Sequence, residues 1–110
     1  MARTSEMTFI GLSGIIYDFS FHTWGATFKP LGAVYFITDR RPKKTGGHLH
    51  KPIYIGQTHD LSARFDAHPK ADYFKRHSAN CICVLLEDDE AQRFVIEHDL
   101  IENYHPRCND

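Results

Sequence analysis

The chain has little cysteine, no long apolar run and almost no net charge, and each shortage excludes a class of protein. Three cysteines in 110 residues do not suggest a framework of disulfides, so a reducing cytoplasm is the simpler expectation. No apolar run approaches the roughly 20 residues that span a bilayer, and the polar N-terminus is unlike a secretory signal. We therefore expect one cytoplasmic domain without a membrane segment.

The net charge of −1 conceals an uneven distribution of charge along the chain. Residues 40–76 carry nine lysines and arginines against three acids, whereas the remainder carries four against eleven. Such a segment is typical of a surface that binds a polyanion, although a solvated loop and helix face has the same composition. The nucleic-acid-binding residues predicted on this basis are Arg40, Arg41, Lys43, Lys44, Lys51, Lys75 and Arg76.

Alternation of apolar and polar residues, or a short apolar run, predicts four strands. These strands cover residues 15–24, 33–38, 52–55 and 80–86. The polar, basic segment 39–51, which contains Pro42, Gly46 and Gly47, predicts a long hairpin loop between the second and third strands.

Helical signals appear at three places along the chain. Thr58 or Asp60 is placed to cap a first helix, and residues 71–77 predict a second. Residues 89–104 predict a third and longer helix, which Asp88 and Asp89 are placed to cap. The order of elements predicts an α+β fold in which helices pack on a small antiparallel sheet.

That sheet is expected to have a three-stranded core and one added N-terminal strand. We assign the added strand to an N-terminal arm at residues 1–30, and the rest of a single compact domain to residues 31–110.

An acidic residue interrupts the apolar stripe of the long helix. At about 100° per residue, Ile96, Leu100 and Phe94 fall on one arc with other apolar residues, and Glu97 projects from its centre. A charge that faces a core is costly unless it is paired or binds a metal. A helix rim, where the carboxylate reaches solvent or meets Arg64, is the structural alternative to a metal ligand.

Other chemically informative residues surround this glutamate at characteristic spacings. Tyr35 ends the sequence Gly-Ala-Val-Tyr, Tyr54 begins Tyr-Ile-Gly, and Arg64 is followed four residues later by His68. The chain closes with Tyr-x-Pro-x-x-Asn, which ends at Asn109.

In this order the pieces resemble the GIY-YIG nuclease superfamily, over roughly residues 31–110. The family usually has Gly two residues before its first tyrosine, where this chain has Ala33. The resemblance implies a metal-dependent endonuclease or nickase that hydrolyses DNA phosphodiester bonds. It further implies Mg²⁺ as the cofactor, with Mn²⁺ as a substitute.

The resemblance also implies a role for each residue of the motifs. Tyr35 would act as general base or position the attacking water, Arg64 would stabilise the transition state, and Glu97 would hold the metal. Tyr54 and His68 would assist, and Asn109 would support the site. This chemistry is coherent, because an arginine fork neutralises phosphate and a phenol needs a nearby cation to act as a base.

Two other interpretations are compatible with the same residues. The chain could be a catalytically inactive nucleic-acid-binding or protein-interaction module that retains the fold. His48 and His50 could bind a transition metal together with Cys81 or Cys83, but the Cys-x-Cys spacing is not that of a zinc knuckle. The sequence does not decide whether a homodimer or a separate specificity protein completes the nuclease.

Overall fold

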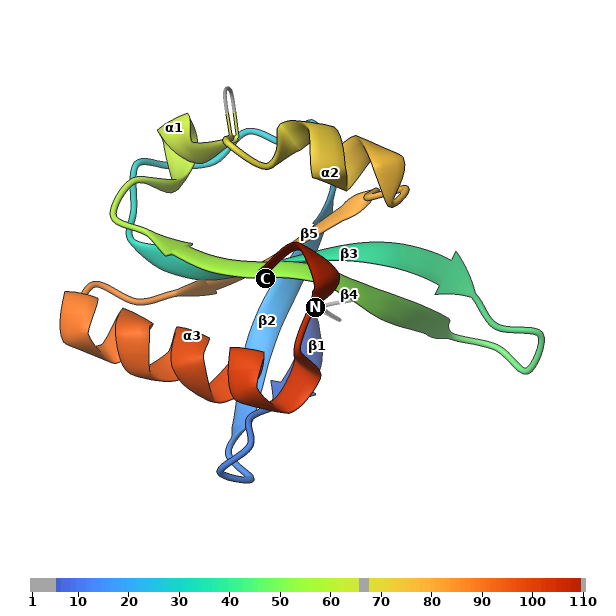
Figure 1. Cartoon of the computed structure of the whole chain (residues 1–110), viewed down its shortest axis with the longest axis horizontal. Coiled ribbons are helices and arrows are strands. Elements are labelled where there is room, and N and C mark those ends of the chain that lie inside the picture. The colour runs from blue at the N-terminus through green and yellow to red at the C-terminus, as the bar shows by residue number, and fades with distance from the viewer. Residues whose placement is uncertain (1–5, 66–67, 110) are drawn as a thin grey trace, which may run out of the picture.

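The computed structural model describes residues 6–65 and 68–109, and these residues form the α+β fold that the sequence predicts. A five-stranded antiparallel sheet has the strand order β1-β2-β5-β3-β4 (Figure 1). Its strands are β1 (Glu6–Ile10), β2 (Ile16–Thr23), β3 (Ala33–Pro42), β4 (His48–Thr58) and β5 (Cys81–Leu86). The helices are α1 (Leu61–Arg64), α2 (Ala71–Arg76), α3 (Glu90–Tyr104) and the 3₁₀ turn η1 (Arg107–Asn109).

Two predictions about the strands are wrong. The N-terminal part adds two strands to the sheet, not one, because β1 pairs with β2 along its whole length. The segment 39–51 is mostly strand: β3 and β4 continue as a two-stranded arm that projects from the body (Figure 1). Gly46 and Gly47, with φ of 99° and 71°, turn the chain where residues with a side chain would be strained.

The predicted helix caps are confirmed. Asp60 accepts a hydrogen bond from the backbone N–H of Ser62 and so begins α1, and Asp89 does the same with Ala91 at the start of α3. Along the described residues, no helix combines the length and apolar character required to cross a membrane.

The sheet separates two apolar cores. Ile96 and Leu100 of α3 pack against one face, together with alternate residues of the strands. Leu61 of α1, Phe74 of α2 and Cys108 of η1 pack against the other face. Figure 1 shows α3 on one side of β3 and β4, with α1 and α2 on the opposite side.

The face of α3 that the structure buries differs from the predicted stripe. Phe94 is 51% exposed, whereas Arg93 is buried with Ile96 and Leu100. The Arg93 guanidinium donates to Gln57 Oε1 at 3.0 Å and to the carbonyl oxygens of residues 87 and 88 at 2.9 Å. These acceptors compensate for burying the charge, which apolar periodicity alone does not anticipate.

A β-bulge in the β3–β4 pair decides which side chains share a face. Ile37 pairs with Tyr54, but the next residue, Thr38, pairs with Pro52, so β4 has one additional residue there. Because side chains alternate along a strand, the additional residue moves the side chains of β4 beyond the bulge to the opposite face of the sheet from the one they would otherwise occupy. Tyr54 therefore lies on the α1–α2 face, while His50 lies with Thr38 on the α3 face.

Candidate active site

The hydroxyl of Tyr35 is the centre of a hydrogen-bonded cluster on the α1–α2 face. The side chain is completely buried in the middle of β3. Arg64, the last residue of α1, donates from Nε to the Tyr35 oxygen at 2.9 Å. His68 Nε2 lies 2.7 Å from the same oxygen. Elements far apart in the sequence thus converge on one phenol oxygen.

A backbone contact determines which nitrogen of His68 carries the proton. The N–H of Lys70 donates to His68 Nδ1 at 2.9 Å, so Nδ1 is an acceptor and the proton of the neutral ring is on Nε2. His68 therefore donates to Tyr35. Burial, followed by the charges of Arg64 and Lys70, lowers the pKa of His68 to about 4. The imidazole is consequently neutral at pH 7, in agreement with this arrangement.

The environment of Tyr35 has opposing effects on its acidity. Burial raises the pKa of the phenol well above its ordinary value, and the hydrogen bond and charge of Arg64 act in the opposite direction. Burial has the larger effect, so Tyr35 is a phenol at pH 7 unless a further cation approaches it.

Tyr54 completes the aromatic part of the cluster. Its ring lies 6.0 Å from that of Tyr35 and 5.3 Å from that of His68, measured between centroids. Gly56 pairs with Tyr35 across β3 and β4. A Cβ at Gly56 would lie 2.5 Å from the Tyr35 hydroxyl oxygen and 2.9 Å from Tyr54 Cε2. The two phenols can therefore approach only because Gly56 has no side chain.

Glu97 comes from α3, on the other side of the edge strand β4. Its side chain is half-buried, and within the described part of the chain its carboxylate makes no hydrogen bond or ion pair. Burial raises the pKa of Glu97, and the charges of Arg64 and then His98 oppose that rise. Glu97 is thus within electrostatic reach of Arg64, and one carboxylate of this kind suits Mg²⁺ that retains several waters.

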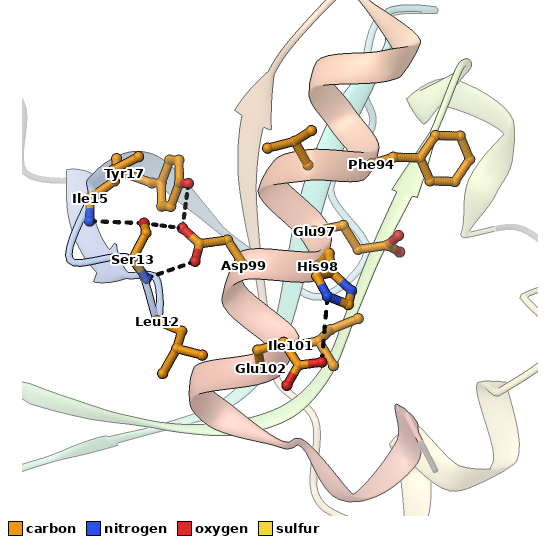
Figure 2. A pocket seen from close by; sticks show the side chains of 11 residues that line it. Leu12, Ser13, Ile15, Tyr17, Phe94, Glu97, His98, Asp99, Ile101 and Glu102 are labelled. Atoms are coloured by element: carbon orange, nitrogen blue, oxygen red, sulfur yellow. Dashed lines mark hydrogen bonds and ion pairs between the residues drawn. The ribbon is translucent and has the colours of Figure 1, made fainter.

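The best-formed cavity of the described residues does not coincide with the tyrosine cluster. It is an open hollow of about 920 Å³ between α3 and the turn that joins β1 to β2. Asp99 and Glu97 both line this hollow. In Figure 2, Asp99 points to the turn, where it accepts from Ser13 and Tyr17, while the Glu97 carboxylate points away from the turn. We locate the candidate chemistry at Tyr35, because two donors converge there and the hollow has a mainly apolar lining.

Asn109 lies beside the edge strand β4. Its Oδ1 accepts from the Ile55 N–H at 2.8 Å, and its Nδ2 donates to the Ile55 carbonyl at 2.7 Å. The amide therefore pairs with the free edge of β4 and holds η1 against it. This contact gives the expected supporting role a physical form, since the strand that Asn109 holds carries Tyr54.

The predicted nucleic-acid-binding residues occupy two surfaces. Most of those in the β3–β4 arm are exposed, but the Arg40 guanidinium stacks 4.4 Å from the Phe21 ring centroid and Arg41 pairs with Asp39 at 2.8 Å. Lys75 and Arg76 are exposed on α2. Of these residues, those at the end of the arm, Lys43 and Lys44, are the freest to follow a phosphate backbone.

The contacts that position the cluster do not follow from the motifs. The backbone N–H of Lys70 sets the tautomer of His68, and no side-chain pattern predicts such a contact. The steric role of Gly56 could have been suspected from its place directly after Tyr-Ile in a strand, where glycine is unfavourable unless backbone and side chains must approach closely.

Comparison with known proteins gives one informative similarity. The chain is 31% identical over 81 residues to UvrABC system protein C of Fervidobacterium nodosum, which corresponds to 66% of this chain. The chain spans only 14% of the length of that protein. No protein-family model matches the chain, and no solved structure matches it. The similarity is consistent with the resemblance that the tyrosine, arginine and glutamate motifs indicate.

Proposed function

We propose that the chain is a metal-dependent endonuclease or nickase of the GIY-YIG type, which hydrolyses DNA phosphodiester bonds at the Tyr35 cluster. The observation that supports this most strongly is the pair of N–H donors, from Arg64 and His68, on one buried phenol oxygen. The similarity to UvrABC system protein C supports a nuclease-type function on DNA.

Arg64 both holds the phenol and receives the phosphate. Its Nε is engaged with Tyr35, whereas Nη1 and Nη2 are left for other partners, Tyr54 among them. These two nitrogens can bind non-bridging phosphate oxygens and stabilise the charge that grows on them in the transition state. The half-buried position of Arg64 strengthens that attraction relative to a fully exposed guanidinium.

Tyr35 acts in its phenolate form: once its own proton has passed to solvent, it positions the attacking water and takes a proton from it. Two N–H groups occupy lone pairs of its oxygen, so the phenol proton is directed away from Arg64 and His68, and its loss leaves a lone pair free for the water. The same two donors stabilise a phenolate when it forms. Because His68 is neutral, it contributes a hydrogen bond without the desolvation cost of a second buried charge.

Glu97 is the residue that would hold the divalent cation. Its carboxylate is half-buried and has no protein partner among the described residues, which fits a ligand of Mg²⁺ or of Mn²⁺ in its place. When bound, the cation supplies positive charge for the phosphate and makes water and phenol more acidic. The exposed basic residues of the β3–β4 arm and of α2 would contact the phosphate backbone on either side of the scissile bond.

One observation favours the alternative of an inactive binding module. Tyr35, Tyr54, Arg64 and His68 do not line the best-formed cavities of the described residues. A module of that kind would bind DNA through the basic arm without cutting it.

Nicking of supercoiled plasmid with added Mg²⁺ or Mn²⁺ distinguishes the two functions. The wild-type protein should convert supercoiled plasmid to open circles only when the cation is present. Glu97→Ala should abolish this conversion, and Glu102→Ala, a carboxylate in the last turns of the same helix, should not. Nicking by Glu97→Ala at the wild-type rate would contradict the proposal, and DNA binding without nicking by the wild type would favour the binding module.

A further inference from the structure

A second cluster of chemically reactive side chains lies on the other face of the sheet, away from Tyr35. One ligand atom each from His50, Cys81 and Cys83 lies within 4.8 Å of the others. The two cysteines are buried neighbours on the same face of β5, and His50 is half-buried on β4. The sequence spacing of the cysteines argues against a zinc knuckle, but the sheet supplies the third ligand from a different strand.

The spacing of the sulfur atoms suits a shared metal ion. Cys81 Sγ and Cys83 Sγ are 4.0 Å apart. With metal–sulfur bonds of about 2.3 Å, that separation corresponds to an S–metal–S angle of about 120°. Both thiols are free in this structure.

Two neighbouring side chains give the cluster the character of a built site. Thr38 Oγ1 lies 2.8 Å from His50 Nδ1 and fixes the imidazole ring, as groups behind metal ligands commonly do. Met7, from β1, places its thioether sulfur 3.5 Å from Cys83 Sγ. Four donors of the N and S type are thus gathered from three strands.

Arg40 lies beside the cluster. Within the described residues, its Nε is buried without a hydrogen-bond partner. A cavity of about 330 Å³, lined by Cys81 and Arg40 among others, offers an approach from solvent.

We propose that His50, Cys81 and Cys83 bind a single thiophilic metal ion, Zn²⁺ or Cu⁺, with Met7 as a further soft ligand. On binding, the two Sγ–H bonds release their protons to water and two metal–sulfur bonds form, without any change in oxidation state. Imidazole and thiolate ligands suit both ions, whereas the thioether suits Cu⁺. This site goes beyond the proposed nuclease function and is separate from Glu97.

The ion would connect three strands that are not hydrogen-bonded neighbours in the sheet. His50 lies where the β3–β4 arm leaves the body, Met7 lies in the edge strand β1, and the cysteines lie in the central strand β5. A shared ion would connect the base of the basic arm to the core. Metal occupancy would therefore fix the direction of the arm without entering the Tyr35 cluster.

Metal titration of the whole chain tests this proposal. Chelator-treated protein is titrated with Zn²⁺, and separately with Cu⁺ in the absence of oxygen, each against a competing chromophoric chelator. The expected result is one equivalent of tightly bound ion. Co²⁺ should give thiolate-to-metal charge-transfer absorption, which a histidine-only surface site cannot produce. Failure of both ions to bind at one equivalent overturns the proposal.

Matched variants identify the ligands. Cys81→Ser/Cys83→Ser should remove the bound equivalent, whereas Cys108→Ser, a buried cysteine on the opposite face, should retain it. His50→Ala should weaken binding at least about 10-fold, and His48→Ala should not. Met7→Leu should weaken Cu⁺ alone if Cu⁺ is the ion. If the double variant does not fold, wild-type affinity in His50→Ala overturns the proposal.

Discussion

The two faces of one sheet carry two different kinds of polar cluster. On the α1–α2 face, charged and neutral N–H donors surround a phenol oxygen. On the α3 face, an imidazole lies beside two thiols and a thioether. The first arrangement suits a phosphate and a hard cation, and the second suits a soft cation. Their separation keeps the two kinds of chemistry from competing for the same ion.

The difference arises from strand geometry. Thr38 is three positions after Tyr35 on β3, so the two side chains point to opposite faces. The bulge in β4 then sends Tyr54 to the first face and His50 to the second. A sheet without that additional residue would place Tyr54 and His50 on the same side and dismantle both clusters.

The largest expected effect concerns Arg64. Arg64→Gln should reduce Mg²⁺-dependent cleavage of labelled duplex DNA by about 10²- to 10³-fold, because glutamine neither neutralises the phosphate nor keeps the charged donor to Tyr35. Arg107→Gln, an exposed arginine on η1, should leave the rate within a few-fold of wild type. Cys81→Ser should reduce it far less than Arg64→Gln, because this variant affects DNA only through the direction of the arm, and that difference sharpens the contrast between faces. An equal reduction of the cleavage rate in Arg64→Gln and Cys81→Ser would contradict the assignment of different chemistry to the two faces.

A change at Gly56 should disturb the tyrosine face through packing. Gly56→Ala places a methyl group against the Tyr35 hydroxyl, so Tyr35 or β4 must shift. We expect destabilisation of about 1–3 kcal/mol in urea denaturation and a clear loss of cleavage. In Gly46→Ala the methyl group meets nothing, so that variant should lose stability through its positive φ but retain cleavage. Wild-type cleavage by Gly56→Ala would show that the close approach is unnecessary.

His68 should make stability depend on pH in a defined window. Its folded pKa of about 4 lies below the ordinary value of 6.5, so the unfolded chain takes the proton first as pH falls. Stability from this residue is present above pH 6.5 and is lost progressively down to about pH 4. Between pH 7 and pH 5 the loss should be about 2 kcal/mol in urea denaturation.

His68→Gln provides the comparison for that measurement. This variant should be less stable at pH 7 but should lose less on going to pH 5, because the other histidines, including His22 with its lowered pKa, remain in both proteins. A pH dependence identical to that of wild type would mean that His68 is not buried in its neutral form.

The smallest expected effect concerns the arm. Replacing Arg41, Lys43 and Lys44 with alanine should make the logarithmic salt dependence of DNA binding shallower, by up to about 0.9 for each phosphate that the arm no longer neutralises. Lys29→Ala, at an exposed lysine outside the arm, should leave the slope unchanged. An unchanged slope in the triple variant would remove the arm from the DNA interface.

Local signals predicted much of the fold. The caps Asp60 and Asp89 were identified because a side-chain oxygen before a helix acts within a few residues. The strand β1 was missed because five residues with weak alternation are stabilised by pairing with β2. The buried Arg93 was missed because its compensation comes from Gln57 and from backbone carbonyls of the preceding turn.

The two candidate sites also differ in how far the sequence predicts them. The residues of the Tyr35 cluster could be proposed from the sequence because each belongs to a recognisable motif. Their hydrogen bonds could not, since the N–H of Lys70 and the approach across Gly56 depend on backbone geometry. The cluster of His50, Cys81 and Cys83 forms only in the observed register of β4 against β3. That register follows from a bulge that the sequence does not reveal.

The most direct test of the central claim is the single-turnover rate of plasmid nicking by Tyr35→Phe beside the wild-type protein, both confirmed as folded by circular dichroism. Phenylalanine keeps the packing of the ring and removes only the oxygen on which Arg64 and His68 converge. We predict a loss of about 10²-fold or more at saturating Mg²⁺. A Tyr35→Phe protein that nicks at the wild-type rate would contradict the account.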